Sequence, residues 1–155
     1  MDHDKALRDH LIELLDGKSA HIAVEPALSG FPLGRINERI PGSPHTPWEL
    51  LEHIRIAQSD ILDFSTNPDY KEMAWPDDYW PKADATEDDW NRSVEEVLGD
   101  LQKMRDLVAD PASGLFAKLE HGQGQTLLRE AMLVADHNSY HIGQLVLLRR
   151  IFENS

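Results

Sequence analysis

The stretch TPWELLEHIRIAQSDILDF (residues 46–64) carries the clearest helix signal in this chain. Thr46 can accept a hydrogen bond at the helix start, Pro47 suits the first helical position, and Glu49 completes a capping box. The apolar residues that follow at helical spacing are Leu50, Leu51, Ile54, Ala57, Ile61 and Phe64. This spacing predicts an amphipathic helix that ends near residue 67, because Pro68 disfavours helix in the residue before it.

Outside that stretch, three further segments show helical spacing, over about residues 4–15, 86–110 and 126–152. Gly17 interrupts the first of them, and residues 19–28 could continue it after a kink. Residues 29–47 are rich in Gly and Pro and predict a loop. The alternation typical of strands is absent. The sequence therefore predicts an all-α fold, a four-helix bundle, as a single domain over residues 1–155.

The segment between the second and third main helices, residues 68–85, is unusually long. It contains four aromatic residues and three prolines, so we expect an ordered crossover packed on the bundle and not a flexible linker. An antiparallel neighbour would need far fewer connecting residues. We therefore predict that the second and fourth helices run parallel and adjacent.

Composition excludes several kinds of chemistry. The chain has no cysteine, so it has no disulfide, no thiolate metal ligand and no cysteine nucleophile. A bound metal must be held by imidazole or carboxylate groups. Any thiol chemistry must use a thiol that a substrate or cofactor brings.

Charge and hydropathy limit the partners. The formal net charge of -13 repels phosphate backbones and anionic lipids, so we expect neither nucleic acid nor membrane as a partner. No apolar run approaches the ~18 residues that span a bilayer. The first residues lack the basic and then apolar order of a signal peptide, and we expect a cytoplasmic protein.

Two histidines stand four residues apart in the last predicted helix. His137 and His141 project from one helix face about one turn apart, a separation at which two ring nitrogens can reach one ion. The residues around them that mark this face as buried are Met132, Val134, Ile142, Leu145 and Val146. The pair alone is a weak signal, because hydrogen bonds satisfy buried imidazoles equally well.

A third histidine, His53, lies on the apolar stripe of the second helix. His53 is seven residues beyond Thr46 and His137 is eleven beyond Thr126, so parallel helices would bring the rings to similar depths. We predict that His53, His137 and His141 bind one divalent transition metal ion, Zn, Ni or Fe. Three ligands leave positions open for water or substrate, which is typical of a catalytic site.

A general base would assist such a site. Glu130 lies seven residues before His137 on the same face, and it is the predicted catalytic residue. Glu49 is one turn before His53, but its capping role explains it without catalysis. Asp136 and Asn138 could orient a ligand ring, although exposure is the simpler interpretation at about 100° from His137.

Aromatic residues and one more histidine could surround the site. The candidates for the walls of a substrate pocket are Trp48, Trp75, Trp80 and Tyr140, with core packing as the alternative. His45 stands just before the Thr46 cap and could line the same end of the bundle.

Two segments, PHTPWELLEH (residues 44–53) and DHNSYHIGQ (residues 136–144), resemble the DinB superfamily of metal-binding four-helix bundles. The resemblance covers essentially the whole chain. It implies parallel second and fourth helices, a three-histidine metal site and a homodimer. It also implies kinship with thiol-dependent transferases and isomerases that use a low-molecular-weight thiol cofactor.

These observations favour a metal-dependent enzyme that acts on a small-molecule substrate, either a hydrolase or a thiol-dependent S-transferase. A metal-binding bundle without catalysis, with a structural or regulatory role, is the competing interpretation. A third is a bundle that satisfies its histidines by hydrogen bonds alone and binds no metal.

Overall fold

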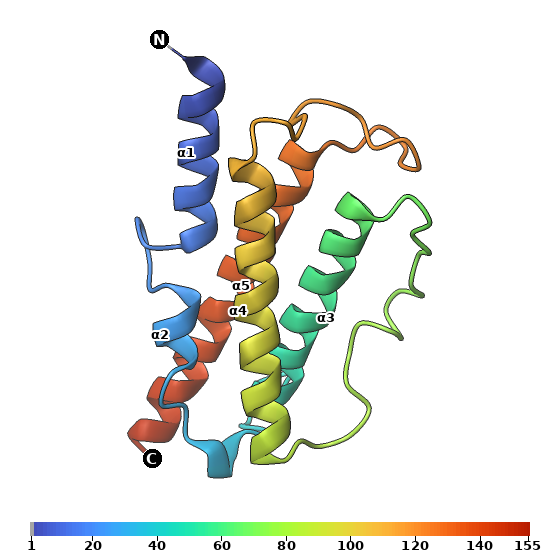
Figure 1. Ribbon diagram of the computed structural model, residues 1–155. Coiled ribbons are helices and arrows are strands. Elements are labelled where there is room, and N and C mark those ends of the chain that lie inside the picture. Colours follow the sequence, from blue (N-terminus) through green and yellow to red (C-terminus); the bar gives the residue numbers. More distant parts are fainter. Residues whose placement is uncertain (1) are drawn as a thin grey trace.

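The computed structural model describes residues 2–155, which form four long helices and one short one (Figure 1). The long helices are α1 (His3–Asp16), α3 (Pro47–Thr66), α4 (Glu87–Ala109) and α5 (Leu127–Glu153). The short elements are α2 (Val24–Leu28) and the 3-10 helix η1 (Leu33–Arg35). No strand forms within residues 2–155, so the all-α prediction is confirmed. None of the helices that the structure describes is long and apolar enough to cross a membrane.

The predicted helix starts are confirmed by their hydrogen bonds. The Thr46 hydroxyl accepts from the Glu49 amide at 3.1 Å, and the Glu49 carboxylate accepts from the Thr46 amide at 2.8 Å. Thr86 and Asp89 form the same reciprocal pair at the start of α4. These capping boxes satisfy backbone N–H groups that have no partner inside the helix.

The first helix ends where the sequence indicates, but the segment after it is less helical than expected. Gly17 adopts a left-handed conformation (φ 65°) and closes α1. Only residues 24–28 of the stretch 19–28 then form a helix. A glycine in this conformation redirects the chain, which is why the second stretch does not continue α1.

The core lies where the apolar stripes of the long helices meet. Leu51 and Ile54 of α3, Val97 of α4 and Val134 of α5 are fully buried. One polar contact crosses this core: the Asn138 amide donates to the Gln58 side chain at 2.6 Å, and Gln58 donates to the Val97 carbonyl at 2.7 Å. The first bond joins α5 to α3 beside the histidines, and the second joins α3 to α4.

The prediction of parallel second and fourth helices is wrong. Figure 1 shows α3 and α5 running in opposite directions. Leu50, near the start of α3, lines a hollow with Leu147, whereas Ile61 lines another with Arg129. The parallel neighbours are α3 and α4. The comparison of His53 and His137 by their distances from the starts of their helices was therefore wrong. In an antiparallel pair, the start of one helix lies beside the end of the other.

The long connection follows from the α3–α4 arrangement. The end of α3 and the start of α4 lie at opposite ends of the bundle, so residues 67–86 must travel the length of a 20-residue helix, about 30 Å (Figure 1). Along this path the Tyr70 and Tyr79 hydroxyls both donate to Asp60, at 2.9 and 2.6 Å. Burial, together with the hydrogen bond to Asp60, raises the pKa of Tyr70 to about 12. The connection is thus tied to the side of α3.

Candidate metal centre

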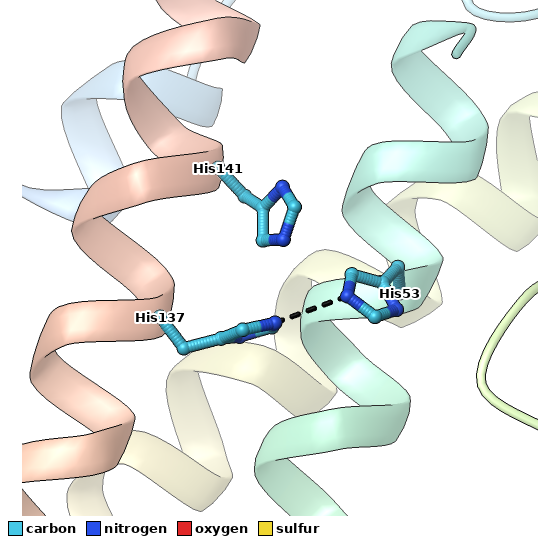
Figure 2. A group of neighbouring side chains, drawn as sticks. All are labelled: His53, His137 and His141. Atoms are coloured by element: carbon cyan, nitrogen blue, oxygen red, sulfur yellow. Dashed lines mark hydrogen bonds between the residues drawn. The ribbon is translucent and has the colours of Figure 1, made fainter. Parts of the chain in front are cut away.

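Three histidines meet between α3 and α5, as Figure 2 shows. His53 comes from α3, and His137 and His141 come from successive turns of α5. Their potential ligand atoms lie within 4.8 Å of one another. The Nε2 atoms of His53 and His137 are 3.0 Å apart. The structure therefore brings together the three residues that the sequence singled out.

Two of the rings are oriented by acceptors outside the cluster. The Nδ1 atom of His53 donates to the Tyr79 carbonyl at 2.8 Å, and that of His141 donates to the Gln144 side-chain oxygen at 2.7 Å. Because these oxygens only accept, each Nδ1 carries the proton of the neutral ring. The Nε2 atom of both rings is then left with a free lone pair.

His137 completes the group and is held less firmly. Its Nδ1 atom is buried without a hydrogen-bond partner among the described residues. Two bare ring nitrogens at 3.0 Å repel each other unless a proton or a cation lies between them. The donor set, three imidazoles whose potential ligand atoms lie within 4.8 Å of one another, suits a divalent transition metal ion.

The surroundings keep these rings neutral. Burial lowers the pKa of His137 to about 4, helped by the nearby His141 and His53 rings. Burial also lowers the pKa of His53 and of His141. Since only the neutral imidazole is a ligand, the group is in its metal-binding form at neutral pH.

The cluster opens into a hollow of about 480 Å³. The Trp80 indole stacks on the His53 ring, with centroids 3.9 Å apart and planes 2° apart. His45 stacks on the same indole at 4.0 Å. Trp75 and Tyr140 line the hollow and are largely exposed, at 70% and 68%. The hollow thus has an aromatic wall and a wide mouth.

The remaining candidates from the sequence are divided between this hollow and other places. Asp136, at an exposed position, lines the hollow. Trp48 is buried instead, and its indole donates to the Ala83 carbonyl at 2.9 Å. Asn138 is buried against Gln58, and Glu49 serves the helix cap.

Glu130 lies apart from the histidine cluster. It is 2% exposed, and its carboxylate accepts from Arg129 at 2.7 Å. It lines a different hollow with Asp60. Leu133 lines both hollows and so marks where they adjoin.

Sequence reasoning missed the two groups that orient the rings. Gln144 stands three residues after His141, and that spacing could have identified it. The Tyr79 carbonyl has no comparable signal, because any residue at that position of the chain supplies a backbone oxygen.

Comparison with known proteins identifies a family. A family model described as the DinB superfamily matches residues 19–145, which is most of the chain and includes all three histidines. No curated protein and no solved structure matches.

Proposed function

Because the chain belongs to the DinB superfamily, we propose that it is a metal-dependent enzyme that acts on a small molecule. In this proposal His53, His137 and His141 hold one divalent ion, Zn, Ni or Fe. The substrate occupies the hollow beside them.

One observation carries the proposal: three ligand groups, and no more, converge at the edge of an open hollow. No Asp, Glu or fourth His within the described residues joins the group. Structural zinc sites are almost always closed by four protein ligands, whereas catalytic sites keep a position for water or substrate. The hollow of about 480 Å³ provides the space for that substrate.

The chemistry divides between the ion and the protein. A bound ion would supply Lewis acidity and would lower the pKa of a water or thiol. The Tyr79 carbonyl and Gln144 orient the His53 and His141 rings. Trp80 covers one face of His53 and shields that ring from water. The hollow binds and orients the reactant.

Two reactions fit these parts, hydrolysis of an ester or amide and transfer of a group to a thiol. The chain lacks cysteine, so the thiol must come from a substrate or from a low-molecular-weight cofactor. A metal-binding bundle without catalysis is the alternative. In favour of that alternative, an ion held by His53 and His137 would cross-link α3 to α5.

A general base has two candidates on α5. We propose Glu130 as the base because it lies on the same face of α5 as His137, although it lines the adjoining hollow. Asp136 is the second candidate because it lines the histidine hollow itself. Loss of a general base reduces a rate about 10²- to 10⁴-fold. Comparing Glu130→Gln with Asp136→Asn identifies the base. Wild-type activity in both variants would exclude the two carboxylates.

Metal analysis of protein purified without a histidine tag tests the proposal. We expect close to one ion per chain after loading with Zn or Ni. A ratio far below one would overturn the proposal. The loaded protein should then hydrolyse an ester or amide, or conjugate a thiol to an electrophile. Inactivity against all of these, with no exchangeable water on the ion, would favour the alternative without catalysis.

We also propose, on family membership alone, that the protein is a homodimer. Analytical ultracentrifugation tests this directly. A single species near the chain mass of 17.6 kDa would contradict it.

A further inference from the structure

A second hollow, of about 300 Å³, adjoins the histidine hollow. Pro44, His45 and Gln144 line both of them. Gln144 is also the hydrogen-bond partner of His141. Gln144 therefore separates the second hollow from the candidate metal centre and contacts both.

The two histidine-bearing helices explain this position. Leu50 lies three residues before His53 on α3, and Leu147 lies six residues after His141 on α5. Because α3 and α5 are antiparallel, moving back along one and forward along the other leads to the same end of the bundle. Both helices thus place leucines beside the centre, toward that end.

The wall of the second hollow offers few free polar groups. In the loop over residues 40–45 the Ser43 hydroxyl donates to the His45 carbonyl at 2.6 Å, and Arg39 donates to the Pro44 carbonyl. Pro41 and Pro44 have no N–H to offer. The rest of the lining is mainly hydrocarbon, from Ile40, Leu50, Leu147 and Leu148.

One of these leucines is poorly covered by the protein itself. Leu147 is 59% exposed, whereas Leu50 and Leu148 are buried. An apolar ligand group beside Leu147 would remove that side chain from water, which favours binding.

We propose that the second hollow is a subsite for an apolar alkyl or aryl group of the substrate whose reacting group lies at the histidine centre. This inference rests on the proposed function. Because Pro44, His45 and Gln144 line both hollows, the occupant that we propose for the second hollow is part of the same small molecule.

A series of alkyl hydroxamic acids tests the inference, because a hydroxamate binds the metal and leaves the alkyl chain to find its own site. Affinities of the Zn-loaded protein for the acids with two, four, six and eight carbons are measured by calorimetry. We expect affinity to rise up to about fourfold for each methylene that leaves water. The rise should level off once the hollow is filled.

A matched pair of variants locates the alkyl chain. Leu147→Asp places a carboxylate in the wall, and the increase per methylene should fall below about twofold. Zn affinity and binding of the two-carbon acid should stay unchanged. Met132→Asp is the control, since Met132 is 51% exposed on the same helix and lines neither hollow.

The outcomes separate the two proposals. Equal affinity along the series, or a chain-length effect that Leu147→Asp leaves intact, would overturn the subsite while the metal centre stands. Failure to retain Zn, or Zn retention with no hydroxamate binding, would overturn the proposed function and the subsite with it.

Discussion

Two polar clusters join α3 to α5, and they differ in where their hydrogen-bond donors point. The first joins Gln58 to Asn138, and the second joins His53 to His137 and His141. They are close neighbours, since Asn138 follows His137 directly and Gln58 is five residues after His53.

The amide cluster is joined by two hydrogen bonds, although the Asn138 Oδ1 atom is buried without a partner. Asn138 donates to Gln58, Gln58 donates to the Val97 carbonyl, and both residues are buried. In the histidine cluster, His53 and His141 instead direct their Nδ1 protons outward, to Tyr79 and Gln144, which leaves their Nε2 atoms free to bind an ion. A buried cluster whose donors reach acceptors on neighbouring helices holds those helices together, whereas a cluster whose ring nitrogens converge suits a cation.

Replacing one of the three histidines should cause the largest change, a loss of Zn affinity. We expect His53→Ala, His137→Ala and His141→Ala each to weaken Zn binding about a thousandfold or more, because loss of a mere orienting partner already costs about 10- to 100-fold. Each variant should remain helical by circular dichroism. Competition with a chelator measures the affinity. His10→Ala, at an exposed position on α1, is the control. Unchanged Zn binding in any ligand variant would contradict the assignment.

The amide cluster should respond in stability instead. Gln58→Ala leaves the Asn138 amide without its partner in the core, removes the extra hydrogen bond to the Val97 carbonyl and opens a cavity, and we expect a loss of about 3 kcal/mol in the free energy of unfolding. Urea unfolding measures this loss. The folded variant should still bind one Zn. Gln102→Ala, at an exposed position on α4, should change stability by less than about 0.5 kcal/mol. Wild-type stability in the Gln58 variant would contradict the structural role of the amide cluster.

Removing the hydrogen bond that orients His141 should cause a smaller loss of Zn affinity than removing the histidine itself. Gln144→Ala removes the acceptor for His141 Nδ1, and we expect Zn affinity to fall about 10- to 100-fold. Gln144→Glu keeps an acceptor oxygen and should retain most of the affinity. If both variants bind Zn equally well, Gln144 does not orient the ring.

Acid should weaken the metal-free protein through the histidine cluster and not through the amide cluster. The pKa of His137 is about 4 in the folded state against 6.5 ordinarily, so the unfolded chain binds more protons between these values. Stability is therefore greatest above about pH 6.5 and falls as the pH drops toward 4. For a partly exposed ring we expect a loss of roughly 2 kcal/mol.

Urea unfolding of the metal-free protein at several pH values measures this loss. His137→Gln should flatten the pH dependence, and Gln58→Ala should leave it in place. A wild-type protein equally stable at pH 4.5 and 7 would contradict the neutral, buried state of His137.

Much of the fold was predictable because helix signals are local. The capping boxes at Thr46 and Thr86 act within four residues, and both helices begin where those residues predict. The prediction of a helix over residues 19–28 was only partly right, because Gly17, in its left-handed conformation, ends the first helix and turns the chain.

The candidate site was predictable only in part. The spacing of His137 and His141 fixes their common face, and apolar neighbours indicate that His53 points into the bundle. Stacking of Trp80 on His53 was not predictable, because these residues are 27 positions apart and meet only through the path of the connection. Glu130 shares a helix face with His137, yet it lines another hollow.

The sequence by itself determined the helices, their buried faces and the three histidines, because these depend on residue type and on spacing within one helix. Only the tertiary structure decided that α3 and α5 run antiparallel, which lone pairs face inward and which rings wall the hollow. Those features depend on how separate helices pack, and an apolar stripe packs well in either direction. The packing of α3 against α5 buries the Gln58–Asn138 contact in the core and places the three histidines at the edge of a hollow, where a ligand can reach them.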